Sequence, residues 1–105
     1  MKDNYQKSIS RAELNSKLGK FVSIEPIAGR NGRGNLKNHH ITHYENGTTL
    51  MSYDTLIAAN IGTELFLTPY HDYSETTSFH CRRYCGLSLV LRRQGLENGE
   101  ITYID

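Results

Sequence analysis

The chain has no long apolar run, no tryptophan, and only two prolines and two cysteines among its 105 residues. Without about 20 consecutive apolar residues, it is predicted to have no transmembrane helix. Residues 1–6 are polar and lack the apolar segment of a secretory signal, so we expect a cytosolic, reducing setting. Cys81 and Cys85 are then predicted to be free thiols. The seven tyrosines are expected at surfaces and interfaces or, as the alternative, half-buried on strands.

Strong charge of one sign is also missing, since 12 basic and 11 acidic residues give a net charge of +1. A DNA mimic would be strongly acidic and a protein that coats duplex DNA strongly basic, so both classes are disfavoured. Two windows nevertheless contain no acid, one from Pro26 to Tyr44 and one from Thr76 to Leu96. They hold Arg30, Arg33, Lys37, His39, His40 and His43, and then Arg82, Arg83, Arg92 and Arg93. The windows predict a local anion-facing surface; the alternative is that flanking glutamates neutralise them.

The residue patterning predicts one α+β domain over residues 1–105, with a short N-terminal helix, an antiparallel meander of four to five strands, and one or two C-terminal helices. Ser10 and Glu13 match a capping box, and Leu14 and Leu18 follow at helical spacing. The turn residues Glu45-Asn46-Gly47 between alternating segments predict a hairpin. The predicted strands are 40–44, 48–53, 55–59 and 64–68, with 21–25 as the fifth.

After Asp72 the pattern changes to a helical period. A helix beginning near Thr77 is predicted, with Ser74 or Thr76 as its cap, and one face is shared by Thr77, Cys81, Tyr84 and Cys85. A second helix is predicted to present Leu87, Val90 and Leu91 as its apolar face and to close on Arg92 and Arg93. Residues 101–104 are predicted to form a short terminal strand.

No catalytic constellation can be assembled from these residues, so the protein is predicted not to be an enzyme. Asp54, Asp72 and Glu75 lie near strand ends and could converge, but they do not define a reaction. A C-x3-C pair with scattered histidines is a poor zinc signature, so no metal and no cofactor are predicted. The basic, glycine-rich segment 29–34 lacks the P-loop pattern. Its backbone N–H groups and guanidinium groups would suit an anion or a partner, and a solvated loop is the alternative.

Three segments carry a resemblance to a known family. These are 29–40, the S-Y-D-T motif at 52–55, and the D-Y-S-E-T-T block at 72–77. In order and spacing they resemble a family of small, uncharacterised phage and mobile-element proteins, over roughly residues 28–99. This chain departs from that pattern at His71, where the family usually has tryptophan, and in its cysteine pair. In size and character the chain also resembles a type II anti-CRISPR, an inhibitor of the RNA-guided nuclease.

The second resemblance implies a phage-encoded antagonist of host defence in the host cytoplasm. It would bind the RNA-guided nuclease, and its guide RNA where phosphates are in reach. The predicted partner-binding residues are Arg30, Asn31, Arg33, Lys37, His39, His40, Arg82 and Arg83. The alternative is a sponge protein, a homo-oligomer that sequesters a cyclic-nucleotide or ADP-ribose-like immune signal. A small zinc-binding module is the third hypothesis.

Overall fold

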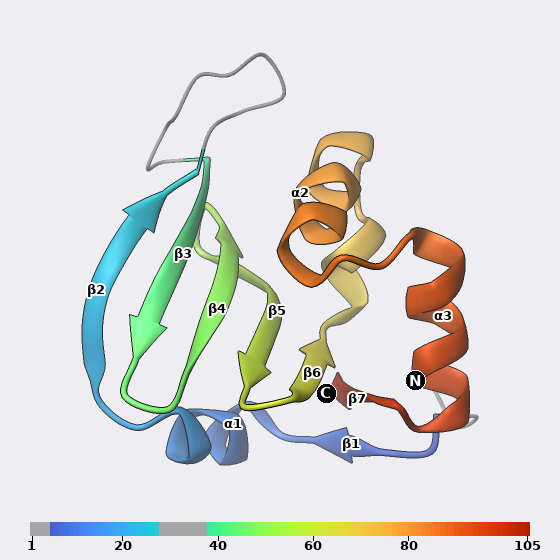
Figure 1. Ribbon diagram of the computed structural model, residues 1–105, viewed down its shortest axis with the longest axis horizontal. Helices are drawn as coiled ribbons and strands as arrows, with labels where there is room; N and C mark the ends of the chain where they lie inside the picture. The colour runs from blue at the N-terminus through green and yellow to red at the C-terminus, as the bar shows by residue number, and fades with distance from the viewer. Residues whose placement is uncertain (1–4, 28–37) are drawn as a thin grey trace.

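The computed structural model of the protein describes residues 5–27 and 38–105 (Figure 1). The predicted partner-binding residues Arg30, Asn31, Arg33 and Lys37 lie outside these described residues. In chain order the elements are β1 (Ser8–Ile9), α1 (Arg11–Leu18), β2 (Phe21–Pro26), β3 (His39–Tyr44), β4 (Gly47–Ser52), β5 (Thr55–Ile61), β6 (Glu64–Leu67), the 3₁₀ helix η1 (Pro69–Asp72), α2 (Glu75–Cys85), α3 (Leu89–Asn98) and β7 (Ile101–Ile104).

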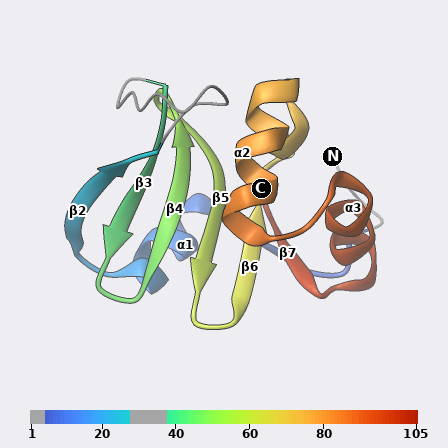
Figure 2. The ribbon, with the colours of Figure 1, turned by 45° about the horizontal axis from the view of Figure 1, so that its top comes forward.

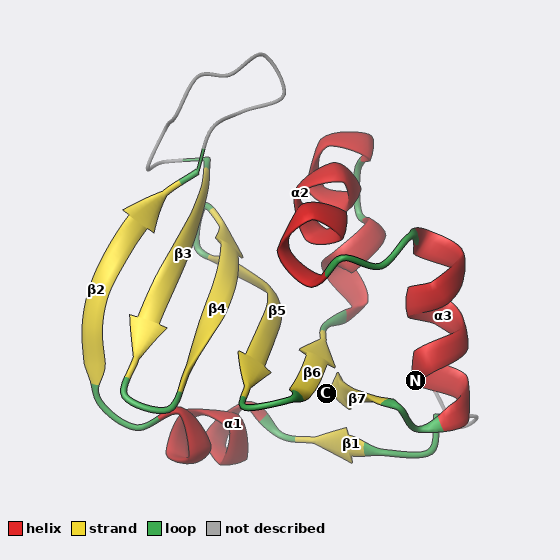
Figure 3. Ribbon diagram, viewed as in Figure 1, coloured by secondary structure: helices red, strands yellow, loops and turns green. Residues whose placement is uncertain are grey.

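The strands form one mixed sheet in the order β1-β7-β6-β5-β4-β3-β2 (Figure 3). Strands β2 to β6 pair antiparallel with their sequence neighbours. Strand β7 runs parallel to β6, and β1 runs parallel to β7. The prediction of an antiparallel meander of four to five strands is therefore wrong, because the sheet has seven strands and two of its pairings are parallel.

The parallel pairings come from a long connection and a very short strand. After β6 the chain passes through η1, α2 and α3, and it returns as β7 with Ile101 opposite Leu65. Parallel neighbours need a crossover of this kind. The residues 101–104 alone do not indicate which strand they will pair with. Strand β1 has two residues, which is too few to show an alternation.

Helices cover both faces of the sheet (Figure 2). On one face, the core includes Leu50, Ile57 and Leu67 of the sheet with Cys81 of α2 and Leu96 of α3. On the other face, the core includes Leu56, Phe66 and Ile104 of the sheet with Leu14 and Leu18 of α1. The fold is therefore a three-layer arrangement in which the sheet separates two apolar cores.

The first helix and the first hairpin support each other. The predicted cap of α1 is confirmed, since Ser10 Oγ accepts a hydrogen bond from Glu13 N at 3.1 Å. The predicted turn between β3 and β4 is also confirmed. Asn46 in that turn donates its backbone N–H to Leu18 O and its side-chain amide to Lys17 O, both at 3.0 Å. The turn thereby satisfies carbonyl groups that the end of a helix leaves unpaired.

Helix α2 presents the face expected from its sequence. Thr77 and Cys81 are buried, and Tyr84 and Cys85 are half-buried. The Tyr84 hydroxyl donates to Thr48 O of β4 at 3.0 Å, which fixes the helix on the sheet. Gly86 ends the helix in the left-handed conformation at φ 77°, and its N–H donates to Arg82 O.

Helix α3 differs from its prediction. Val90 and Leu91 are 61% and 49% exposed, whereas Arg92 is fully buried in the middle of the helix. Its guanidinium donates to Ser78 Oγ of α2 at 2.6 Å and to His71 O of η1 at 3.4 Å. Arg92 therefore holds three helical segments together and does not belong to an anion-facing surface.

Candidate ligand-binding pocket

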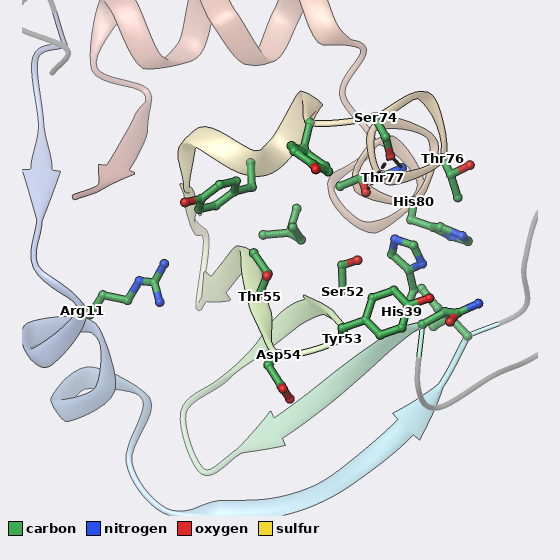
Figure 4. A pocket seen from close by; sticks show the side chains of 15 residues that line it. Arg11, His39, Ser52, Tyr53, Asp54, Thr55, Ser74, Thr76, Thr77 and His80 are labelled. Atoms are coloured by element: carbon green, nitrogen blue, oxygen red, sulfur yellow. Dashed lines mark hydrogen bonds between the residues drawn. The ribbon is translucent and has the colours of Figure 1, made fainter.

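A pocket of about 790 Å³ lies where the turn between β4 and β5 faces the start of α2 (Figure 4). This volume is in the range of small-molecule sites. Most of the wall residues in the described part of the chain carry a hydroxyl, imidazole or amide group. The described wall consists of Arg11, Ile27, Asn38, His39, Ser52, Tyr53, Asp54, Thr55, Ile57, Tyr70, Tyr73, Ser74, Thr76, Thr77 and His80.

The floor of the pocket includes a tight two-residue turn. Ser52 pairs with Thr55 across the β4–β5 hairpin, so Tyr53 and Asp54 form its loop. Tyr53 has a φ of 54°, in the left-handed region that side chains rarely adopt. Its N–H donates to Asn38 O at 2.6 Å, which joins the hairpin to the start of β3. Tyr53 as a whole is 61% exposed.

The opposite wall is the N-terminus of α2, and its cap is built from the D-Y-S-E-T-T block. Ser74 Oγ accepts from Thr77 N at 3.1 Å and donates to Thr77 Oγ1 at 3.0 Å. The preceding 3₁₀ helix is positioned by Thr68, whose hydroxyl donates to the carbonyl oxygens of Leu56 and Ile57. These side-chain bonds place the hydroxyl groups of the first turn of α2 at the edge of the pocket.

Two imidazoles stack beside the pocket. The rings of His39 and His80 have centroids 4.2 Å apart and planes inclined by 35°. His39 is 7% exposed, and its Nε2 has no hydrogen-bond partner among the described residues. Burial, followed by the neighbouring His40, lowers the pKa of His39 below its usual range. His39 is therefore held in its neutral form at neutral pH.

The described wall carries little formal charge. Arg11 and Asp54 contribute one charge of each sign, and the lowered pKa of His39 keeps that ring neutral. Asp72 does not join Asp54, because its carboxylate accepts from Arg93 Nη2 at 3.1 Å in an ion pair. The convergence of Asp54, Asp72 and Glu75 considered from the sequence is thus not formed at this pocket. The chemistry of the described wall is that of hydrogen bonding and ring stacking.

The predicted partner-binding residues within the described part of the chain do not gather at one place. His39 lines the pocket, while His40 follows it on β3 and its side chain leaves the opposite face of the sheet. Arg82 and Arg83 are exposed on α2 and are not among the wall residues. Arg83 lies over the Phe79 ring, 5.7 Å from its centroid.

Most of the pocket-wall residues lie outside the two acid-free windows, so those windows did not predict this site. Tyr53, Tyr73 and the serine and threonine hydroxyls come from the S-Y-D-T motif and the D-Y-S-E-T-T block, the same segments that carry the family resemblance, and Tyr70 lies two residues before that block. They are 20 positions apart in the sequence, and only the packing of α2 against the hairpin brings them together. The order and spacing of these two motifs were the sequence features that could have indicated this site.

The two cysteines lie away from this pocket and are free thiols, as predicted. A hydrogen bond from the Cys81 thiol lowers the pKa of Cys85 to about 6, against the effect of burial. The same bond, together with burial, raises the pKa of Cys81. Cys85 borders a second cavity of about 350 Å³. In the described ranges, no group of three or more His, Cys, Asp or Glu side chains is arranged to hold a metal ion.

The fold and the pocket define a small three-layer α+β domain with a polar, aromatic-lined site on one side. Residues 22–98 match a family of unknown function, DUF8033, and the chain belongs to that family. No curated protein and no solved structure matches it. Among the helices of the described residues, none combines the length and apolar character needed to cross a membrane.

Proposed function

We propose that the protein acts by binding, and that its pocket takes a nucleotide-type ligand. One observation carries this proposal: the S-Y-D-T motif and the D-Y-S-E-T-T block, far apart in sequence, meet as the two walls of one pocket. The resemblance to phage and mobile-element proteins supplies the context, an antagonist that withdraws a nucleotide signal from host defence. Such a role requires affinity for the nucleotide but no catalysed reaction.

The composition of the wall supports a binding role. Three exposed tyrosines offer ring faces, and side-chain hydroxyls and an amide offer donors and acceptors. Asp54 is the one carboxylate among the described wall residues, and the thiols of Cys81 and Cys85 are elsewhere. Pockets of this kind orient a ligand through a few polar groups set among apolar and aromatic contacts.

Calorimetry and thermal unfolding of the full chain test the proposal. The probes are ADP-ribose, 3′,5′-cyclic AMP and a cyclic dinucleotide. At 100 times its Kd, a bound ligand should stabilise the fold by about 2.7 kcal/mol. Arg82→Ala, at an exposed position outside the wall, is the matched control and should bind equally well. Absence of heat and of thermal shift with every nucleotide would refute the proposal, and size-exclusion chromatography would show whether a homo-oligomer forms.

A second candidate is inhibition of the RNA-guided nuclease, and the arrangement of Arg82 and Arg83 favours it. Both are exposed on α2, and the Phe79 ring constrains the Arg83 guanidinium, as a preorganised contact to a guide-RNA phosphate would require. The double variant Arg82→Glu, Arg83→Glu should then lose co-elution with the guide-bound nuclease and inhibition of target cleavage. The double variant Lys17→Glu, Lys20→Glu, at exposed positions on and directly after the distant α1, is the charge-matched control. Equal inhibition by both variants would remove the arginine pair from consideration.

A further inference from the structure

Tyr53 occupies a backbone conformation that its residue type does not favour. Within residues 5–27 and 38–105 it is the one non-glycine residue with positive φ, at 54°. It is the first residue of a two-residue hairpin loop, where glycine, asparagine or aspartate is usual. A bulky side chain in the left-handed region costs free energy, because Cβ crowds the backbone. Such strain tends to persist at functional sites.

Packing of the ring does not account for this choice of residue. Tyr53 is 61% exposed and belongs to neither apolar core. The hydrogen bond of the turn to Asn38 O uses the backbone N–H, which any residue other than proline would supply. What the side chain does is form part of the pocket, on the side that faces Ser74 and Thr77 of α2 (Figure 4).

We infer that Tyr53 is the stacking platform of the pocket, and that the ligand presents to it a nucleobase, a flat heteroaromatic ring with polar edges. This inference rests on the proposed function and names the part of the ligand that the described wall recognises. Tyr70 and Tyr73, 41% and 78% exposed, line the same pocket with their ring centroids 6.4 Å apart. Asn38, Ser52 and Thr55 add donors and acceptors to the wall of the same pocket.

The charge of the described wall fits a base better than a phosphate chain. Arg11 and Asp54 nearly cancel, whereas recognition of phosphates by a protein uses an excess of basic groups and depends steeply on salt. Ring stacking is largely independent of salt and tolerates different bases. We therefore expect a nucleoside to keep most of the affinity of its 5′-monophosphate, with little change between low and moderate salt.

The test uses the full chain and two variants at one position, Tyr53→Phe and Tyr53→Asn. The probes are adenosine, guanosine, cytidine, uridine and their 5′-monophosphates, titrated by calorimetry. Phe keeps the ring, so its Kd should stay near that of the wild type. Asn has no ring, and its Kd should rise on the order of 10- to 100-fold. Asn tolerates positive φ, so its unfolding temperature should equal or exceed that of the wild type.

Equal affinity of Tyr53→Asn and wild type would overturn the inference while the proposed function stands. The same holds for a nucleoside that binds more than 10-fold more weakly than its monophosphate. Preference for glucose or galactose over every nucleoside would overturn the ligand class. Binding of a short single-stranded RNA without binding of free nucleosides would keep the base-stacking role and refute the free nucleotide signal. If Tyr53→Asn does not fold, ligand-induced shifts of the Tyr53 ring protons in wild-type NMR spectra decide instead, and unshifted protons overturn the inference.

Discussion

His71 is a buried imidazole with an unusual protonation equilibrium. It is 4% exposed, and its Nδ1 has no hydrogen-bond partner in the described part of the chain. Burial lowers its pKa to about 4; the positive charges of Arg92 and Arg93 act in the same direction, and Asp72 opposes them. Between pH 6.5 and 4 the unfolded chain therefore binds a proton that the folded protein does not. The free energy of unfolding must fall as the pH falls through this window.

We expect His71 to contribute a loss of about 3 kcal/mol between those two pH values. Urea unfolding of the wild type and of His71→Phe at a series of pH values measures it. The variant keeps a buried ring but cannot titrate, so its stability should fall less steeply. Because the pKa of His39 is also lowered, the difference between the two curves is the informative quantity. Parallel curves would contradict the assignment.

Cys85 is expected to react as a thiolate near neutral pH. Its pKa is lowered to about 6 by the Cys81 thiol, and the buried Arg92 guanidinium acts in the same direction. The rate of alkylation by iodoacetamide should therefore rise with pH around a midpoint near 6, well below that of an ordinary thiol. Cys81 is fully buried and should be modified only after unfolding. Mass spectrometry of the wild type and Cys85→Ser distinguishes the two sites, and a midpoint above pH 8 would refute the expectation.

Among the elements, α3 and β7 approach each other unusually closely at Gly95. A Cβ atom added there would lie 2.5 Å from Ile101 Cδ1 and 2.7 Å from Cγ1. Although alanine is favoured over glycine inside a helix, this overlap should dominate, and Gly95→Ala should destabilise the fold by about 1–3 kcal/mol. Chemical denaturation measures the loss. Ile101→Val removes Cδ1, so the double variant should be more stable than Gly95→Ala alone; strict additivity would show that the contact is not the cause.

How far the elements could be predicted depends on how local their signals are. The cap at Ser10, the turn at Asn46 and the buried face of α2 each depend on a few neighbouring residues, and all three form as expected. The prediction of the apolar face of α3 was wrong because Arg92 is buried through hydrogen-bond partners on η1 and α2. The sequence pattern of the helix itself cannot reveal these partners. Hydrophobic periodicity assumes that charged residues face solvent, and a buried arginine whose Nη groups donate to neighbouring segments breaks that assumption.

Prediction of the pocket from the sequence was limited in the same way, over a larger separation along the chain. His39 was predicted to bind a partner for its place in a basic window, and it lines the pocket as a buried neutral ring. The motifs at 52–55 and 72–77 were visible in the sequence, but their meeting depends on how α2 packs on the hairpin. The tertiary arrangement therefore turned two separate signals into one site.

At the scale of the whole molecule, the family match at 22–98 begins within β2 and ends with α3. Strand β1, helix α1 and strand β7 lie outside it, yet they complete the fold. Strand β7 separates β6 from β1, and α1 covers the sheet face opposite α2 and α3. The matched region carries both pocket motifs, and the flanking elements bury the apolar face behind it.

This division of roles predicts that changes on the buried face of α1 alter stability and leave ligand recognition intact. Leu14 and Leu18 are almost completely buried against Phe66 and Ile104, so Leu14→Ala and Leu18→Ala should each cost about 2–5 kcal/mol of unfolding free energy. Asn15→Ala, on the exposed side of α1, should change it by less than about 0.5 kcal/mol. Urea unfolding gives these values, and calorimetry on the folded variants gives the nucleotide affinity. A core variant that stays folded but loses affinity would show that the buried face of α1 shapes the pocket from the far side of the sheet.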